Sequence, residues 1–142
     1  MGSVYLINPK NIMTQLVRSH LDLKIWINSR ELVGELYRIT KQFPAEERFD
    51  LTSQMRRAVI SIPSNIAEGA ARGGTKEFIR FLYIASGSLS ELETQLLLSV
   101  DLGYCSEYEV DDFREKISRI RRQIFATIRQ LQMRLAKMKS VV

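Results

Sequence analysis

The stretch from Ser61 to Arg72, SIPSNIAEGAAR, contains the best candidates in this sequence for chemically reactive side chains. At about 100° per residue, its polar side chains and two earlier ones share one face of a helix. Glu68 is a carboxylate that could move a proton, and the neighbouring arginines could bind a small anion. This polar face consists of Gln54, Arg57, Ser61, Asn65, Glu68 and Arg72.

Catalysis would need more than a lone carboxylate. No histidine, second acid or cysteine stands at a spacing from Glu68 that would supply a nucleophile, a base or a metal site. We therefore expect no enzymatic activity, no metal and no cofactor, and we interpret the polar face as a solvated or interhelical one. An enzyme that binds a small anion through this face is the weaker hypothesis.

A proline interrupts the same helix. Pro63 lacks an amide proton and frees the carbonyl of Val59, which predicts a kink near Pro63. Ser61 or Asn65 could donate to that carbonyl. We expect Gly69 to loosen the helix end, and Asn65, Glu68 and Arg72 to pair along the helix or across subunits.

Basic residues make up a second candidate site, near the end of the chain. Residues 116–142 contain eight lysines and arginines and no acid, whereas residues 1–115 contain 13 bases and 16 acids. At helical spacing, six of the eight lie away from the apolar stripe and predict a ridge that suits a phosphate backbone. The alternative is an ordinary solvated face that complements the helix dipole. This basic ridge consists of Lys116, Arg119, Arg122, Arg129, Arg134 and Lys137.

Nothing in the sequence indicates that specific bases are read. The sequence has no recognised nucleic-acid motif, and its aromatic residues lie mostly on apolar stripes. Phe125 lies off the main stripe, where its ring could stack on a base or pack against a partner.

Length and composition limit the class of protein. The chain has 142 residues, of which 45% are hydrophobic and 26% charged, as in one soluble globular domain. Cys105 is the single cysteine, so an internal disulfide is excluded. No apolar run approaches the roughly 18 residues of a membrane span, which predicts a cytoplasmic protein without a membrane partner. We interpret residues 1–20 as an N-terminal arm and residues 21–142 as the folded domain.

Periodicity predicts four helices in that domain, over about 21–43, 50–72 and 75–103, with the fourth from 106 to at least 135. Asp50 or Thr52 is expected to cap the second helix and Thr75 the third, whereas Ser106 and Glu109 form a capping box for the fourth. The fold class is therefore all-α, an up-down-up-down four-helix bundle. Its apolar stripes are Leu21, Ile25, Leu32, Leu36, Ile39 and Phe43; Leu51, Met55, Ala58, Ile62 and Ile66; Phe78, Leu82, Ala85, Leu89, Leu92, Leu96 and Val100; and Val110, Phe113, Ile117, Ile120, Ile124, Ile128, Leu131 and Leu135.

The third helix has apolar residues outside its stripe, which predicts burial on a second side, in a subunit interface. Gly87 lowers helix propensity there, and such a small residue permits close helix approach. The alternative is close packing inside one bundle. The additional apolar residues are Ile79, Tyr83, Ile84, Leu97 and Leu98.

Three blocks of residues 51–96 resemble the four-helix-bundle proteins encoded in intervening sequences of bacterial 23S rRNA genes. Weaker similarity covers residues 21–132. The resemblance implies a ring-shaped homopentamer without enzymatic activity, and a relation to the accessory protein of diversity-generating retroelements, which binds nucleic acid and a reverse transcriptase. The blocks are Gln54 with Arg56-Arg57-Ala58, then Ser61 to Gly69, then Phe78 to Leu82 with Ala85 to Leu89 and Glu91 to Leu96.

The ridge and the resemblance together favour a homopentameric accessory protein that binds RNA or DNA without sequence-specific readout. Five copies of the basic segment would form a collar of positive charge, so affinity could arise from avidity. The alternative is a structural or adaptor oligomer whose partner is a protein with an acidic surface.

Overall fold

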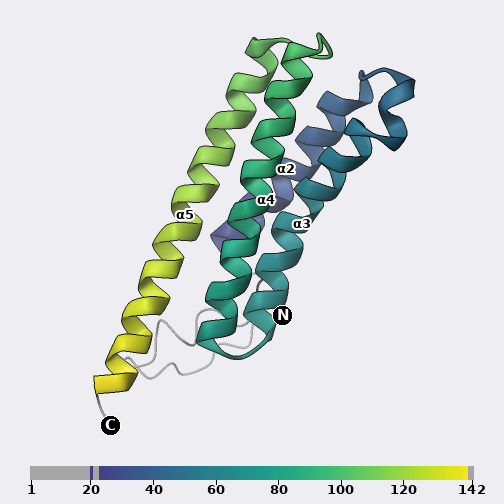
Figure 1. Ribbon diagram of the computed structural model, residues 1–142. Helices are drawn as coiled ribbons and strands as arrows, with labels where there is room; N and C mark the ends of the chain where they lie inside the picture. The colour runs from purple at the N-terminus through teal and green to yellow at the C-terminus, as the bar shows by residue number, and fades with distance from the viewer. Residues whose placement is uncertain (1–19, 21–22, 141–142) are drawn as a thin grey trace, which may run out of the picture.

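The computed structural model describes His20 and residues 23–140. This part of the chain is all-helical and has no strand (Figure 1). Of the predicted arm, only His20 falls inside the described residues. The elements are α2 (Lys24–Lys41), the 3₁₀ turn η3 (Ala45–Phe49), α3 (Leu51–Ala71), α4 (Thr75–Asp101) and α5 (Glu107–Ser140).

The four α-helices run alternately up and down, and each packs against two others (Figure 1). Helices that follow one another in the chain are neighbours, and α5 closes the arrangement by contacting α2. The diagonal pairs, α2 with α4 and α3 with α5, have no Cα atoms within 8 Å of each other in the described residues. The predicted up-down-up-down four-helix bundle is therefore confirmed.

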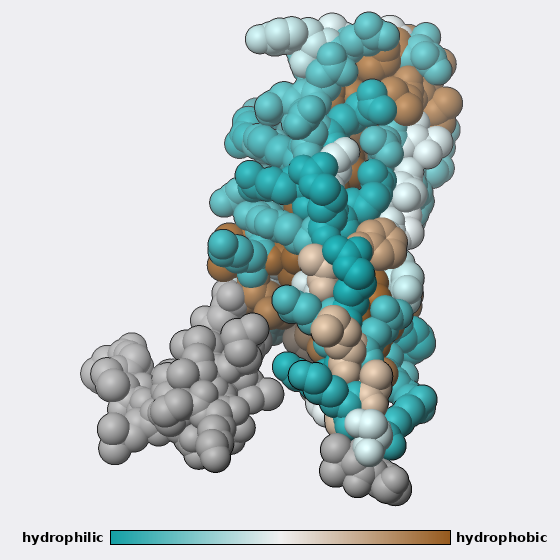
Figure 2. Space-filling model, turned by 90° about the vertical axis from the view of Figure 1, so that its left-hand side faces the viewer, coloured by the Kyte–Doolittle hydropathy of each residue, from teal (hydrophilic) through white to brown (hydrophobic). Residues whose placement is uncertain are grey.

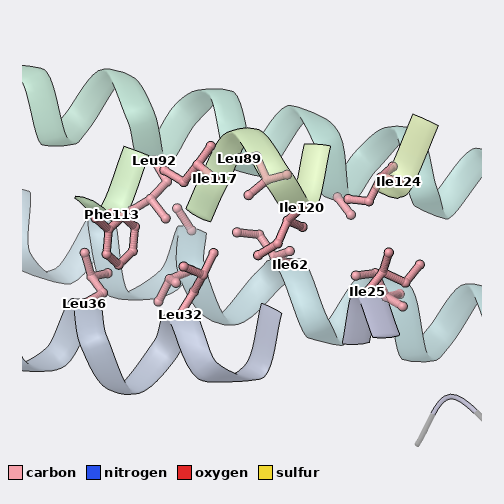
Figure 3. Packing of buried hydrophobic residues seen from close by; sticks show 14 of the residues in the cluster. Ile25, Leu32, Leu36, Ile62, Leu89, Leu92, Phe113, Ile117, Ile120 and Ile124 are labelled. Carbon is pink, nitrogen blue, oxygen red and sulfur yellow. The ribbon is translucent and has the colours of Figure 1, made fainter. Parts of the chain in front are cut away.

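The interior is built from the apolar stripes that the sequence predicts. Figure 3 shows side chains from all four helices pointing into one shared core, with Leu32, Ile62, Leu89 and Ile117 among them. Burying an aliphatic side chain of this kind contributes about 1.5–3 kcal/mol. Four predicted members, Ile39, Leu51, Phe78 and Val100, pack against the edge of the core. Leu135 is also only half-buried, and Leu21 lies outside the described residues. The stripes therefore fix how the helices face one another.

Two of the predicted helix caps are wrong. Asp50 is at the N-cap position of α3, but its side chain makes no capping bond, and the Leu51 amide donates to Glu47 Oε2 at 3.2 Å. Gly74, rather than Thr75, is the N-cap residue of α4, again without a side-chain bond. The sequence missed Glu47 because it lies in η3, a short turn that brings its carboxylate back to the helix start.

The capping box before α5 is confirmed. The Ser106 amide donates to Glu109 Oε2 at 3.1 Å, and the Glu109 amide donates to Ser106 Oγ at 3.2 Å. Acidic residues occupy the first turn of α5 and lysines the last, which suits the helix dipole at both ends. This long helix of 34 residues carries the basic ridge.

Pro63 lies inside α3, which stays helical from Leu51 to Ala71. The two side chains expected to donate to Val59 do not do so. Ser61 Oγ donates to the carbonyl of Ala58 at 2.8 Å, and Asn65 Nδ2 donates to the carbonyl of Ser61 at 2.7 Å. Each side chain therefore bonds to a carbonyl one turn before it, and the kink at Pro63 stays a prediction.

Candidate nucleic-acid interface

The basic ridge lies on the side of α5 that faces away from the bundle. Arg119, Arg122, Arg129, Arg134 and Lys137 are all exposed. Figure 2 looks onto the α5 side of the molecule, where hydrophilic residues cover most of the face. Five of the six predicted members are therefore accessible to a ligand.

Lys116, the first predicted member, is already engaged. Its ammonium forms an ion pair with Glu35 of α2 and a second one with Asp112 at 3.4 Å. The hydrogen bond to Glu35 is the main reason that the pKa of Lys116 is raised above its ordinary value. Lys116 therefore joins α5 to α2, and the accessible ridge begins at Arg119.

Arg121 and Arg114 are held in the same way on the other flank of α5. Both guanidinium groups contact Glu93 of α4, at 3.2 Å and 3.4 Å. The sequence shows no acid within residues 116–142, but Glu35 and Glu93 reach this part of α5 from other helices. Partners 21 to 81 residues away leave no local signal in the sequence.

The remaining ridge is long and continuous. In the part of the chain that the structure describes, its five exposed members form no ion pair. From Arg119 to Lys137 the helix rises by about 27 Å, which matches about eight nucleotides of a strand in a duplex. At about 100° per residue, four of the five cluster opposite the core stripe, and Arg134 lies on the flank toward α2. This arrangement suits contacts with successive phosphates.

Phe125 does not present its ring to a base. It packs edge-to-face against Tyr83 of α4, with ring centroids 6.1 Å apart, and it borders the core. Such aromatic pairs stabilise a helix interface. Within the chain the ring packs on α4, and the two expected uses, stacking on a base and packing against a partner, stay predictions.

The polar face of α3 is an edge between α3 and α4. Ser61 Oγ and Ser88 Oγ lie 2.6 Å apart and join the two helices. Arg57 and Gln54 line a hollow of about 350 Å³ beside Ser61, with Glu91 on the α4 side. Ser61 is therefore interhelical, whereas Gln54 and Arg57 are exposed beside the hollow, so this part of the face is solvated at one end and interhelical at the other.

The lower part of the polar face is an ion pair along the helix. Arg72 Nη2 donates to Glu68 Oε1 at 2.8 Å, and both side chains are about half exposed. The Arg72 guanidinium also lies over the Phe81 ring, 5.4 Å from its centroid. The predicted pairing along the helix is confirmed for Glu68 and Arg72. The Asn65 side chain donates instead to the backbone carbonyl of Ser61 in the same helix.

Apolar side chains lie exposed along the outer side of α4. Four of the five predicted ones are exposed in two groups, Tyr83 with Ile84 and Leu97 with Leu98, and Leu102 follows the second group at the end of α4. Exposed Ser90, Glu91 and Thr94 lie between the two groups. The fifth, Ile79, packs against the core instead. A Cβ atom at Gly87 would meet nothing within 4 Å, so the single chain does not need a glycine there.

The described residues contain no group of three or more histidine, cysteine, aspartate or glutamate side chains that could hold a metal ion. None of their helices is long and apolar enough to cross a membrane.

Comparison with known proteins identifies the family. A comparison with curated proteins finds no match. The family model described as 23S rRNA-intervening sequence protein matches residues 21–126, about three quarters of the chain. The match includes the polar face and the start of the ridge, whereas Arg129, Arg134 and Lys137 lie beyond it. The chain belongs to the 23S rRNA-intervening sequence protein family.

Proposed function

We propose that this protein is a non-enzymatic, homopentameric accessory protein that binds RNA or DNA through the phosphate backbone. One observation carries the proposal: four exposed cationic side chains follow one face of α5 and a fifth, Arg134, is exposed on its flank, while Lys116, Arg114 and Arg121 are paired with acids. Among the described residues these five bases take part in no ion pair, so their charges are available to phosphate groups.

The ridge favours affinity without sequence readout. Long basic side chains at phosphate spacing contribute a salt-dependent attraction that does not depend on the bases. In a ring, copies of the ridge would act together, so a longer strand would bind more tightly than a short one.

The exposed apolar residues of α4 support assembly. Two exposed apolar groups, Tyr83 with Ile84 and Leu97 with Leu98 and Leu102, would be a liability on a monomer, and exposed Gly87 beside the first group lets another helix come close. Burial between subunits accounts for both features.

Assembly is tested by introducing charge into these two groups. The double substitution Ile84→Asp and Leu98→Asp is expected to convert a pentamer of about 82 kDa, five times 16.4 kDa, into monomers, because buried unpaired carboxylates are costly. Native mass spectrometry measures the outcome. Ile27→Asp on α2 is the matched control, since Ile27 and Ile84 are equally exposed, at 41% and 40%. A wild-type monomer, or a double variant with the wild-type mass, would contradict the proposed interface.

Binding is tested by fluorescence anisotropy of an unstructured RNA at increasing salt, with DNA of the same sequence beside it. For one ridge with five contacts we expect log affinity to fall against log salt with a slope of about −3 to −4. An RNA of 32 nucleotides should bind more tightly than one of eight. No binding at low salt would contradict the proposal and favour the adaptor hypothesis. A pull-down after nuclease treatment, which would retain an acidic protein or a reverse transcriptase, then tests that hypothesis.

A further inference from the structure

The lower end of the bundle contains a groove that α2 does not cover. Its volume is about 480 Å³, and it lies between the start of α2, the turn from α3 to α4, and α5. Leu23, Phe78 and Leu131 supply apolar lining, and Thr127 and Arg134 supply polar lining. A groove of this size accommodates a few apolar side chains.

The apolar stripe of α5 continues past this groove. Leu131 is its last buried member. Leu135 and Met138 follow on the same face, three to four residues apart, but Leu135 is half-buried and Met138 is 60% exposed. The apolar stripe of α5 therefore extends beyond the part that α2 covers, because α5 has 34 residues and α2 only 18. In Figure 1 the last turns of α5 extend below α4.

Leu23, where the continuous described part of the chain begins, lines this groove. Met13, Val17 and Leu21 stand four residues apart and four before Ile25, a buried residue of α2. They repeat the spacing of a stripe that packs on a helix.

The contacts between α2 and α5 give the register. Glu35 pairs with Lys116, and Asn28 Nδ2 donates to Gln123 Oε1 at 2.9 Å, so seven residues on one helix match seven on the other. The same register places Leu23, which has extended backbone at the start of α2, level with Ile128, so Met138 lies ten residues or about 15 Å further along α5. The ten residues from Met13 to Leu23 span about 15 Å as a helix and about 33 Å when extended, which is enough to reach that level.

We propose that Met13, Val17 and Leu21 dock in the groove of their own chain and cover the exposed end of the α5 stripe. The inference does not depend on nucleic-acid binding or on assembly. It predicts that two parts of the chain more than a hundred residues apart lie side by side.

Cross-linking of the full chain tests the contact. In a Cys105→Ser background, Met13→Cys with Met138→Cys is expected to form an intramolecular cross-link with a short bismaleimide, identified by intact mass and peptide mapping. The control is Met13→Cys with Met133→Cys, since Met133 is equally exposed but lies on the opposite face of α5. Equal cross-linking at 133 and 138 would overturn the proposal, as would a product that joins two chains.

Thermal unfolding gives a second readout. Val17→Asp is expected to lower Tm by about 5 °C or more, because it places a carboxylate in the groove. Gln15→Asp adds the same charge outside the series and should leave Tm within about 1 °C. Equal Tm values for both variants and the wild type would overturn the docking.

Discussion

Replacing Arg122 and Arg129 by glutamate is expected to lower the affinity for single-stranded RNA about a hundredfold at roughly 0.1 M salt. At this salt concentration each lost phosphate contact lowers the logarithm of the association constant by about 0.7. The new carboxylates also repel the phosphates. Both side chains are exposed and neither takes part in an ion pair, so the fold should be retained. Anisotropy measures the affinity, and the salt slope should fall in magnitude by about 1.4.

The matched control reverses two bases elsewhere. Arg38→Glu with Lys41→Glu changes the net charge by the same amount at the end of α2, where both side chains are exposed. We expect this variant to lose less than about threefold in affinity, since long-range charge is screened beyond about 10 Å. Equal losses in the two double variants would show that net charge, and not the ridge, determines binding. Circular dichroism and native mass must be unchanged for either result to count.

The sequence predicts this fold well because each helix carries its own evidence. A stripe such as Leu82, Leu89 and Leu96 repeats every seven residues, and in the structure all three are fully buried. The Ser106–Glu109 capping box is equally local, since both partners lie within four residues. Features that a single helix or turn encodes can be predicted from one sequence.

Pairing between helices leaves no such local trace. The sequence alone makes Lys116 a free member of the ridge, whereas Glu35, 81 residues earlier, forms an ion pair with it. Glu93 likewise holds Arg114 and Arg121 from α4. The charge of a helix face therefore depends on which neighbours reach it, and the bundle has to be assembled before the accessible part of the ridge can be distinguished from the paired part.

Gly69 shows the same limit in packing. The sequence suggests that this glycine loosens the end of the second helix, but in the structure it is buried in the last part of α3 against α4. A Cβ atom at this position would lie 2.6 Å from Phe81 Cβ and 3.2 Å from Phe78 Cδ1. Because Phe81 Cβ is attached directly to the α4 backbone, the clash can be relieved only if the two helices move apart. Gly69 therefore permits close packing of α3 and α4.

Replacing Gly69 by valine is accordingly expected to lower the free energy of unfolding by about 3 kcal/mol, measured by urea denaturation. Helix propensity alone would raise the free energy of unfolding by a few tenths of a kcal/mol, because valine forms helices better than glycine. The sign of the measured change in that free energy therefore separates packing from propensity. Gly34→Val on α2 is the matched control, since a Cβ atom there meets nothing within 4 Å, and its effect should stay below about 1 kcal/mol. If both variants were as stable as the wild type, α3 and α4 would not approach each other as closely as the structure places them.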